Sequence, residues 1–523
     1  MKIHVGLVGP SPAWEQICLQ EGVPCGGVDL HLGRLKENCS VLVVNRPLTS
    51  AERDCVEQYL REGGALLGSA RHLSQFSGMG SRRERVDYIL SEHDTIIPDV
   101  LLMDLALVGE ISNEANILRT QEGTYAVFAG PLGGGYAVAL PFDIDDSLFD
   151  ARVANKNFYA KVERLPSERV SLVSKGEVRY LVHRSLEYLH HVRGVWYAHL
   201  WYFPGDNENI FAFRVDTDRS QREEIDALYE IARRHECSLS WYLDVKSHET
   251  WLKHFQSLVN QEFGVHCYEH HVFPTVDANL KNITRAIREM QAAGLRPRGF
   301  AAPYGVWTQE LAQTLDQLGF EYSSEFSYAY DTFPLYPEFP AGRYGTLQVP
   351  IHPICIGSML RVGYSDAQMK EYFKMVIDYK WRRNEPLFFY HHPLHKRWSV
   401  AEFIFDCTYQ YSVLNMTLGE YARWWKQREK LKMTIDYEED SITSKPGPSS
   451  GDAAPSDFRL RVSTPRGNYA NFPLEGRIEL TPVSRWSETR APLPPPADIR
   501  RIREFDLRGM LGDLYTSMTR KSK

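Results

Sequence analysis

The sequence predicts an α/β protein made of a doubly wound parallel α/β domain, a central (β/α) barrel and a small C-terminal appendage of strands and one helix. Short β-rich runs alternate with helical stretches over residues 1–140, and the same alternation resumes over 205–430. After Lys430 the composition changes. The 523 residues leave room for two or three domains, and 43% hydrophobic residues suffice for well-filled cores.

The N-terminal domain has the pattern of an open parallel sheet. Ile3–Val8 and Val41–Val44 are rich in β-forming residues, and Ala65–Leu67 follows a pair of glycines. Ala51–Glu62, between the last two of these runs, has helical periodicity. Because alternating strands and helices favour parallel pairing, we expect a parallel sheet covered by helices.

A connecting region is predicted over 141–204. It contains the acid cluster Asp143-Ile144-Asp145-Asp146, which a solvated turn or a helix start explains better than a second cation site. Leu181–Leu189 has an amphipathic helical pattern. The aromatic residues between Trp196 and Phe203 are expected to form a core against the bottom of the barrel rather than a platform for sugar rings.

The region 205–430 alternates helical patterns with short β-rich runs, as in a (β/α) barrel. In such barrels the catalytic groups lie at the C-terminal ends of the strands, where the loops converge. The expected helices are Gln221–His235, Asn279–Gly294 and Thr308–Gly319, and the expected strands include Leu239–Leu243 and Phe388–His391.

The last part of the chain is expected to be an appendage. Residues 441–457, rich in Ser, Pro and Gly, are typical of a flexible linker. Within 458–523, Phe458–Ser463 and Gly476–Pro482 have a β pattern. Ile499–Thr519 has a helical pattern whose apolar positions predict docking on a protein partner or on the body of the protein.

Two short segments in the central region offer metal-binding chemistry. His266 and His270 are four residues apart, a spacing that brings two imidazoles to one face of a strand or a helix, where they could bind one ion. Upstream, an apolar run ends in Asp216 and Asp218, whose spacing on a strand directs both carboxylates to the same side. One acid could then bind a cation while the other stays ionised beside it as a base.

Two further segments also end an apolar run with polar or turn-forming residues. Arg298–Gly305 ends in the turn around Tyr304, and Leu387–Pro393 ends in His391 and His392. Taken singly, these residues fit helix caps, turns and ordinary packing. Because all four segments occur in one chain and in the expected order, chance is a much weaker explanation for them together than for any one alone.

The order and content of these segments resemble the NodB-like polysaccharide deacetylases, metal-dependent hydrolases that remove acetyl groups from N-acetylated sugars. The resemblance covers about residues 205–425 and implies the distorted (β/α) barrel of that family. It also implies roles for the site residues: Asp216 as general base, Asp218 with His266 and His270 as ligands of a divalent metal, most readily Zn²⁺, the backbone N–H of Tyr304 as an oxyanion donor, and His392 as general acid, with His391 as the alternative.

This chain departs from the pattern of the family at several positions. Thr217 separates the two aspartates, so Asp216 and Asp218 could exchange roles, and Cys267 replaces the usual serine or threonine between the histidines. Ala301 replaces the arginine that steadies the catalytic aspartate, a loss for which Arg298 or Arg214 could compensate. The fourth motif of the family has no clean match, and its candidates here are Glu325, Asp331 and Trp307.

Residues 1–140 resemble class I glutamine-amidotransferase-like domains. Those domains carry a nucleophilic cysteine where this chain has Gly68-Ser69-Ala70. Without the thiol, the resemblance implies a scaffold or binding domain, because a serine nucleophile at Ser69 would need a base that the sequence does not identify.

The function that follows is a metal-dependent carbohydrate N-deacetylase, a hydrolase acting on carbon-nitrogen bonds other than peptide bonds. Two alternatives stay open. Ala301 and the missing fourth motif favour a catalytically inactive carbohydrate-binding or scaffold protein in glycan assembly. The motifs specify attack on an acyl carbon and would equally suit an amidase with a non-sugar substrate.

Charge and composition exclude other classes of protein. A net charge of -7, a pI near 6.2 and the lack of a sustained basic face argue against a nucleic-acid partner and favour a neutral or cationic substrate. No run of about 18 apolar residues predicts a membrane span. The apolar run in the first ten residues is too short for a secretory signal. The eight cysteines are scattered and include no CxxC pair, which predicts reduced thiols and a cytoplasmic protein.

Overall fold

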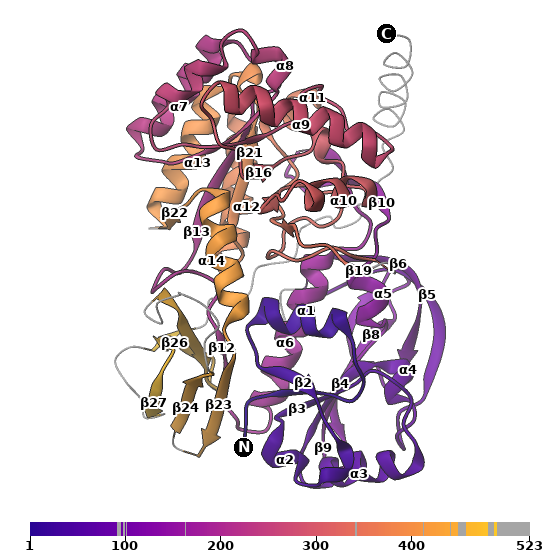
Figure 1. Cartoon of the computed structure of the whole chain (residues 1–523). Coiled ribbons are helices and arrows are strands. Elements are labelled where there is room, and N and C mark those ends of the chain that lie inside the picture. The colour runs from indigo at the N-terminus through magenta and orange to yellow at the C-terminus, as the bar shows by residue number, and fades with distance from the viewer. Residues whose placement is uncertain are drawn as a thin grey trace.

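The computed structural model describes residues 1–91, 96–97, 100, 102–162, 164–339, 342–411, 413–439, 441–447, 457–479 and 486–488. Three groups of elements make up the molecule (Figure 1): the N-terminal sheet in indigo and purple, the central sheet with its helices in magenta and orange, and the C-terminal strands in gold. The central group lies above the other two in this view, and the N-terminus lies near the gold strands.

The N-terminal sheet has nine strands and is only partly parallel. Strands β2, β1, β3, β4 and β9 pair in parallel, whereas β8, β7, β5 and β6 continue the sheet in antiparallel pairs. In sheet order the strands are β2 (Cys25–Gly27), β1 (Val5–Leu7), β3 (Val41–Val44), β4 (Ala65–Ser69), β9 (Gly135–Leu140), β8 (Tyr125–Leu132), β7 (Ile117–Thr120), β5 (Ser81–Leu90) and β6 (Met103–Ser112).

The prediction of a wholly parallel sheet is therefore wrong for the last four strands, and for the pair β8 and β9 a tight turn is the reason. Gly133 and Gly134 join β8 to β9 with φ of 58° and 95°, values that glycine adopts without steric cost. A two-residue turn can only join antiparallel strands, since a parallel pair needs a long crossover.

Helices cover both faces of the parallel strands, as expected. Along β3, Val41 and Val43 pack in one core cluster while Leu42 and Val44 pack in another, which is the alternation of a strand buried on both faces. The first cluster includes residues of α1 (Pro12–Glu21), α5 (Ile144–Leu148) and α6 (Lys175–His191), and the second includes residues of α2 (Leu35–Asn38), α3 (Ser50–Arg61) and α4 (Ala70–Leu73).

The predicted connecting region belongs to this packing. Its amphipathic stretch forms α6, whose Leu181 and Leu189 are fully buried in the same core as α1. The acid cluster precedes and begins the short helix α5, as the helix-start interpretation predicts. The antiparallel pair β10 (Val153–Asn157) and β11 (Ser167–Ser171) lies between these two helices in the sequence.

The central sheet has eight parallel strands and curls into a half-barrel. Among the described residues no pairing joins its two edges, so the barrel is open rather than closed. The strand order is β20 (Leu347–Gln348), β17 (Tyr322–Ser323), β16 (Gly299–Phe300), β15 (Glu262–Val265), β14 (Ser240–Leu243), β13 (Ile210–Asp216) and β21 (Leu387–His391), with β22 (Leu414–Asn415) also paired to β13.

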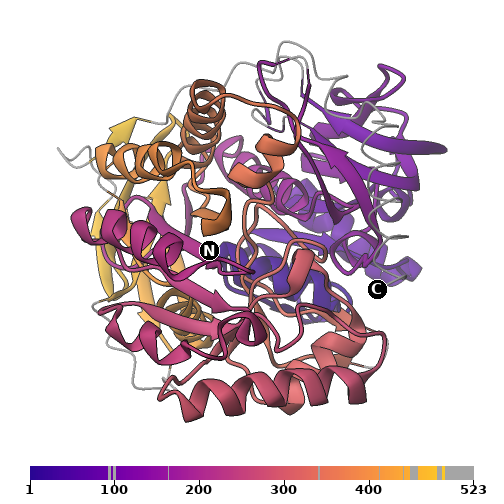
Figure 2. The same cartoon turned by 90° about the horizontal axis from the view of Figure 1, so that it is seen from above.

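Helices pack on one side of this sheet (Figures 1 and 2). Phe211, Phe213 and Val215 of β13 belong to the core that these helices share, whereas Ala212 belongs to the core on the other side. The alternation therefore directs Arg214 and Asp216 away from the helices. The covering helices are α7 (Arg222–Arg234), α9 (Val276–Ala292), α10 (Gln309–Gln317), α12 (Asp366–Arg382) and α13 (Trp398–Gln410).

The C-terminal strands join the rest of the molecule through β12 (Tyr197–Leu200), which lies in the predicted connecting region and pairs with β25 (Arg459–Ser463). Trp201, Tyr202 and Phe203 after β12 are buried beside α14 (Leu418–Lys430), which agrees with the predicted aromatic core. The other C-terminal strands are β23 (Met433–Glu438), β24 (Ser441–Pro446), β26 (Asn468–Pro473), β27 (Gly476–Glu479) and β28 (Ser487–Glu488).

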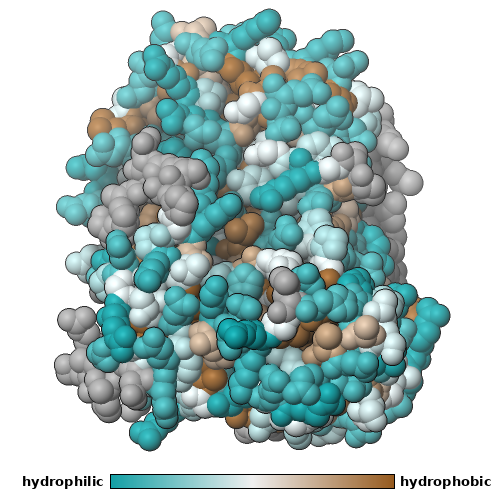
Figure 3. Space-filling model, turned by 60° about the horizontal axis from the view of Figure 1, so that its bottom comes forward, coloured by the Kyte–Doolittle hydropathy of each residue, from teal (hydrophilic) through white to brown (hydrophobic). Residues whose placement is uncertain are grey.

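Two C-terminal predictions need correction or lie outside the structure. Residues 441–446, predicted to open a flexible linker, form β24, because they pair with β23 on one side and β27 on the other. The helix predicted over 499–519 lies outside the described residues. Within the described part of the chain no helix combines the length and apolar character that crossing a membrane requires. The face seen in Figure 3 is mostly hydrophilic, with small separate apolar patches.

Candidate metal centre and its pocket

The four segments singled out from the sequence meet at one edge of the central sheet. Asp216 is the last residue of β13, and His266 and Ala301 directly follow β15 and β16. His392 directly follows β21. Because these strands are parallel neighbours, their carboxyl ends lie at the same edge, and the loops after them line one pocket of about 230 Å³.

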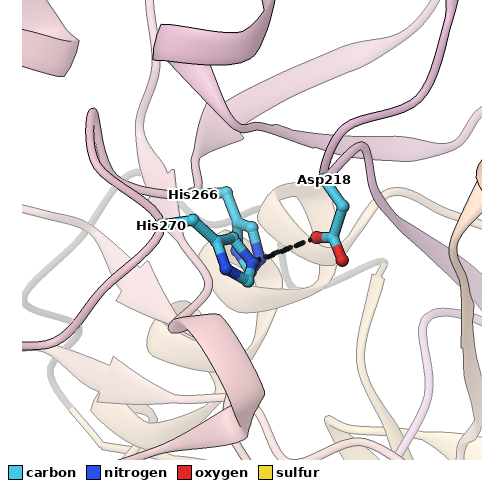
Figure 4. A group of neighbouring side chains, drawn as sticks. All are labelled: Asp218, His266 and His270. Atoms are coloured by element: carbon cyan, nitrogen blue, oxygen red, sulfur yellow. Dashed lines mark hydrogen bonds and ion pairs between the residues drawn. The ribbon is translucent and has the colours of Figure 1, made fainter. Parts of the chain in front are cut away.

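Three side chains converge at this edge (Figure 4). Asp218 Oδ1 lies 3.3 Å from His266 Nε2 and 3.2 Å from His270 Nε2, and the two Nε2 atoms are 3.1 Å apart. Ligand atoms about 2.0–2.1 Å from one tetrahedral zinc ion would be about 3.3 Å from each other. The three donor atoms therefore have the spacing of ligands of one ion, and they form the one such group among the described residues.

Turns rather than regular elements bring these three side chains together. The sequence argument placed the two histidines on a common strand or helix, whereas the chain leaves β15 at Val265 and turns through Cys267, which has a φ of 67°. Asp218 also has a positive φ, 38°, directly after the buried Thr217. The ligand positions thus depend on backbone conformations that spacing alone does not predict.

His266 is oriented by its second nitrogen. Its Nδ1–H donates to the carbonyl of Ala301 at 2.7 Å, so the neutral ring presents the lone pair of Nε2 toward Asp218. Ala301 therefore contributes through its backbone carbonyl. Burial raises the pKa of Asp218, but His392 and the two ligand histidines outweigh it and hold that pKa well below its ordinary value.

Asp216 has an arginine partner on its own strand. Arg214 donates to both carboxylate oxygens, with Nε–Oδ1 at 2.7 Å and Nη2–Oδ2 at 2.5 Å, and both side chains are buried. Burial raises the pKa of Asp216, but Arg214 and His266 outweigh it, so the pKa lies below its ordinary value. Arg298, the other candidate for this role, instead pairs with Glu321.

The two late histidines occupy different sides of the sheet. His392 lines the pocket, with its Nε2 3.8 Å from Asp218 Oδ2 and 3.9 Å from Asp216 Oδ2. Burial lowers the pKa of His392, but Asp218 and other neighbours raise it to about 10. His391 is fully buried and donates to the carbonyl of Lys396 at 3.0 Å.

Strand alternation explains why His391 is not brought into the site. Leu387 and Phe389 pack in the helix-side core, so His391, two residues further along β21, faces the same side. It does not line the pocket. Of the two late histidines, His392 is therefore the one that lines the pocket.

Tyr304 lies at the mouth of the pocket. Its side chain is about half exposed, and its ring lies 5.0 Å from the ring of His270. Its φ of 60° places it in the left-handed region within the predicted turn. The side chain of the residue predicted to supply the oxyanion donor thus lies next to His270.

The three candidates for the fourth motif do not line the pocket. Gln348 donates to Glu325 at 2.8 Å, and burial raises the pKa of this acid to about 7. Asp331 pairs with Lys380 at 2.7 Å, and the ring of Trp307 stacks on the ring of Phe339. All three therefore make these contacts outside the pocket.

Several pocket residues escaped the sequence argument because they come from segments without a motif. Glu168 reaches the pocket from β11, outside the half-barrel, and accepts a hydrogen bond from Arg361 at 3.0 Å. His395 carried the one usable signal, since it closely follows His391 and His392 in the sequence. The pocket residues that the sequence argument missed include Glu168, Cys355, Ser358, Arg361 and His395.

The N-terminal domain has its own polar cluster at a strand end. His72 Nδ1 lies 3.0 Å from Ser69 Oγ and 3.2 Å from Asp143 Oδ1. A relay from acid to histidine to serine needs both ring nitrogens, whereas here one nitrogen faces both partners. Ser69 also caps α4, with an ordinary φ of -73°. The cluster therefore lacks the arrangement of a nucleophile with its base.

Comparisons with known proteins return distant structural matches. No family model matches the chain, and no curated protein matches it. A protein assigned as a polysaccharide deacetylase from Mycobacterium smegmatis is similar with a TM-score of 0.38 and 15% identity, covering 43% of this chain and 93% of that one.

Two further solved structures are similar at the same low level. A protein assigned as a polysaccharide deacetylase from Pseudomonas aeruginosa PAO1 has a TM-score of 0.37 and 14% identity, covering 42% of this chain and 91% of that one. A pseudoenzyme of carbohydrate esterase family 4 from Bacillus anthracis has a TM-score of 0.30 and 14% identity, covering 42% and 68%. At such TM-scores the matches carry no conclusion about this chain, whose function is inferred from its own residues.

Proposed function

We propose that this protein is a metal-dependent hydrolase that removes N-acetyl groups from an amino sugar or a polysaccharide. One observation supports it most strongly: Asp218, His266 and His270 offer three donor atoms within 4.8 Å of one another, in a pocket that Asp216 and His392 also line. This geometry supports hydrolysis at an acyl carbon. The sugar follows from the resemblance of the motifs to NodB-like deacetylases.

The donor set fits a divalent cation, most readily Zn²⁺. Two imidazoles and one carboxylate leave a fourth tetrahedral position for water or substrate, as in catalytic zinc sites. Asp218 Oδ1 is buried and has no hydrogen-bond partner among the described residues, although two Nε2 atoms lie within 3.3 Å of it. A bound ion would polarise the acyl oxygen and acidify a water molecule.

The remaining residues divide the proton transfers between them. Asp216, kept ionised by Arg214, accepts a proton from the attacking water. His392, whose Nε2 lies within 3.9 Å of the carboxylates of Asp216 and Asp218, donates a proton to the leaving amine. The backbone N–H of Tyr304 stabilises the developing oxyanion. Arg214 thereby supplies the partner that Ala301 cannot, which favours an active enzyme over an inactive scaffold.

The size of the pocket indicates how the substrate binds. At about 230 Å³ it is smaller than the usual site for a whole ligand. It suits an acyl group and the atoms next to it, while the rest of a larger substrate lies outside. This arrangement fits deacetylation along a chain of sugars, and it also fits an amidase with a small acyl group.

Metal content and acetate release test the proposal. The purified chain is expected to hold about one zinc ion per molecule and to release acetate from N-acetylglucosamine oligomers, and chelation should abolish the release. Asp216→Asn should lower kcat by about 100- to 10,000-fold. Arg298→Met, a change on the surface, serves as the control. Unchanged activity after chelation would overturn the proposal, whereas release from non-sugar amides alone would make the protein an amidase.

A further inference from the structure

His392 has different partners on the two sides of its ring. Both carboxylates lie on the Nε2 side, 3.8 Å away for Asp218 Oδ2 and 3.9 Å for Asp216 Oδ2. On the other side, Nδ1 lies 3.8 Å from Cys355 Sγ. The rings of Tyr390 and His395 pack edge-on against the imidazole, with centroids 5.5 Å and 5.3 Å away.

Cys355 is held in a fixed place beside this ring. It is 3% exposed, it immediately precedes α11 (Ile356–Arg361), and its sulfur also lies 3.5 Å from Ser358 Oγ. The hydroxyl of Tyr390 donates to the carbonyl of Pro353 at 2.9 Å, which ties the segment before the cysteine to the strand that leads into His392. Burial raises the pKa of the thiol, and the contact with His392 outweighs this effect and lowers it.

A histidine that gives a proton through Nε2 needs a partner on Nδ1. The hydrogen bond at one ring nitrogen decides which tautomer is present and how the ring is turned. The three candidates for the fourth motif, Glu325, Asp331 and Trp307, lie away from the pocket. The contact at Nδ1 is therefore supplied by sulfur.

We propose that Cys355 is the positioning residue of His392: its sulfur fixes the ring so that Nε2 faces the place where the acyl group reacts. This inference rests on the proposed function, in which His392 protonates the leaving amine. The hydrogen bond at Nδ1 keeps the proton-bearing Nε2 aimed at the substrate. A ring without this contact would turn, and misplacement by about 1 Å can cost about 100-fold in rate.

The choice of leaving group gives a test that a merely structural cysteine would not pass. Hydrolysis of an N-acetylglucosamine oligomer expels an amine that needs a proton, whereas 4-nitrophenyl acetate expels a phenolate that leaves without one. Cys355→Ala is expected to lower kcat on the oligomer by about 10- to 100-fold, with KM nearly unchanged, and to change the rate on the ester by less than about 3-fold. Cys355→Ser, which keeps a hydrogen-bonding group, should recover most of the loss.

Cys407→Ala is the matched control, because Cys407 is another buried thiol of the half-barrel on α13, and it should leave both rates unchanged. Equal losses on both substrates after Cys355→Ala, or no loss on either, would overturn the proposal.

A spectroscopic arm separates failure of this inference from failure of the proposed function. In histidine-labelled protein, the ¹⁵N signal of His392 Nδ1 should shift after Cys355→Ala and stay in place after Cys407→Ala. If wild-type protein hydrolyses neither substrate, the proposed function fails and this signal alone decides the contact. An unmoved Nδ1 signal means that the sulfur does not orient the ring.

Discussion

The N-terminal sheet and the central sheet both carry a histidine and an aspartate at the carboxyl ends of parallel strands, yet the two clusters differ in how their polar atoms are used. At the edge of the N-terminal sheet, Ser69 and Asp143 share one nitrogen of His72, and Ser69 caps a helix. At the edge of the central sheet, Asp218 and two histidines direct three separate atoms to one point.

This difference teaches that a position at a strand end is not sufficient evidence for a site. In the N-terminal cluster the polar groups contact each other: Ser69 Oγ lies within hydrogen-bonding distance of His72 Nδ1 and accepts a hydrogen bond from the backbone N–H of His72. In the central cluster the buried Oδ1 of Asp218 accepts no hydrogen bond from any residue that the structure describes, an arrangement that costs stability unless something else binds there. The two clusters therefore differ in whether a buried polar atom remains available to bind a ligand. Four sets of substitutions test this difference.

The largest effect is expected from removing a ligand of the central cluster. His266→Ala should abolish zinc binding and lower activity by more than the roughly 100- to 10,000-fold expected for loss of a general base, because the Lewis acid is lost with the ligand. Zinc analysis of the purified protein and acetate release measure the two effects. His72→Ala is the equivalent change at the other edge and should keep the zinc. Retained zinc in His266→Ala would remove the distinction between the two clusters.

The second change separates the roles of the two aspartates. Asp216→Asn should keep the zinc and lose about 100- to 10,000-fold in kcat, because its carboxylate is paired with Arg214 and lies outside the ligand group. Asp218→Asn should lose the zinc as well. The reverse pattern would mean that Asp216 binds the metal and Asp218 acts as the base.

The sequence predicted the members of this site better than their arrangement. Asp216, Asp218, His266, His270, Tyr304 and His392 all line the pocket, because parallel strands bring their carboxyl ends to one edge. The positive φ values of Cys267 and Asp218 could not be foreseen, since neither is a glycine.

Long-range packing set the rest of the site and of the fold. Arg214 was one of two candidates until strand alternation placed it beside Asp216. Cys355 and Glu168 reach the pocket from segments that no motif marks. In the N-terminal sheet, one glycine turn reversed the strand direction that the alternating pattern predicted.

The third change concerns the buried pair beneath the site. Arg214→Met leaves the carboxylate of Asp216 buried without its partner, which should lower the free energy of unfolding by about 3–5 kcal/mol. Urea denaturation measures this loss. Adding Asp216→Asn removes the uncompensated charge and should restore much of the stability, although not the activity. Equal stability of the single and double variants would mean that the charge is solvated.

The smallest effect is expected at the edge of the N-terminal sheet. Ser69→Ala removes the cap of α4 and a contact with His72, so it should cost about 1 kcal/mol of stability, as helix caps typically do. Acetate release should stay within about 2-fold of wild type, because the nitrogen of His72 that faces Ser69 also faces Asp143, so the cluster lacks the relay that a serine nucleophile needs. A large loss of activity after this single change, with stability nearly intact, would mean that the N-terminal edge takes part in catalysis. A cluster whose polar groups contact each other could then still be a functional site.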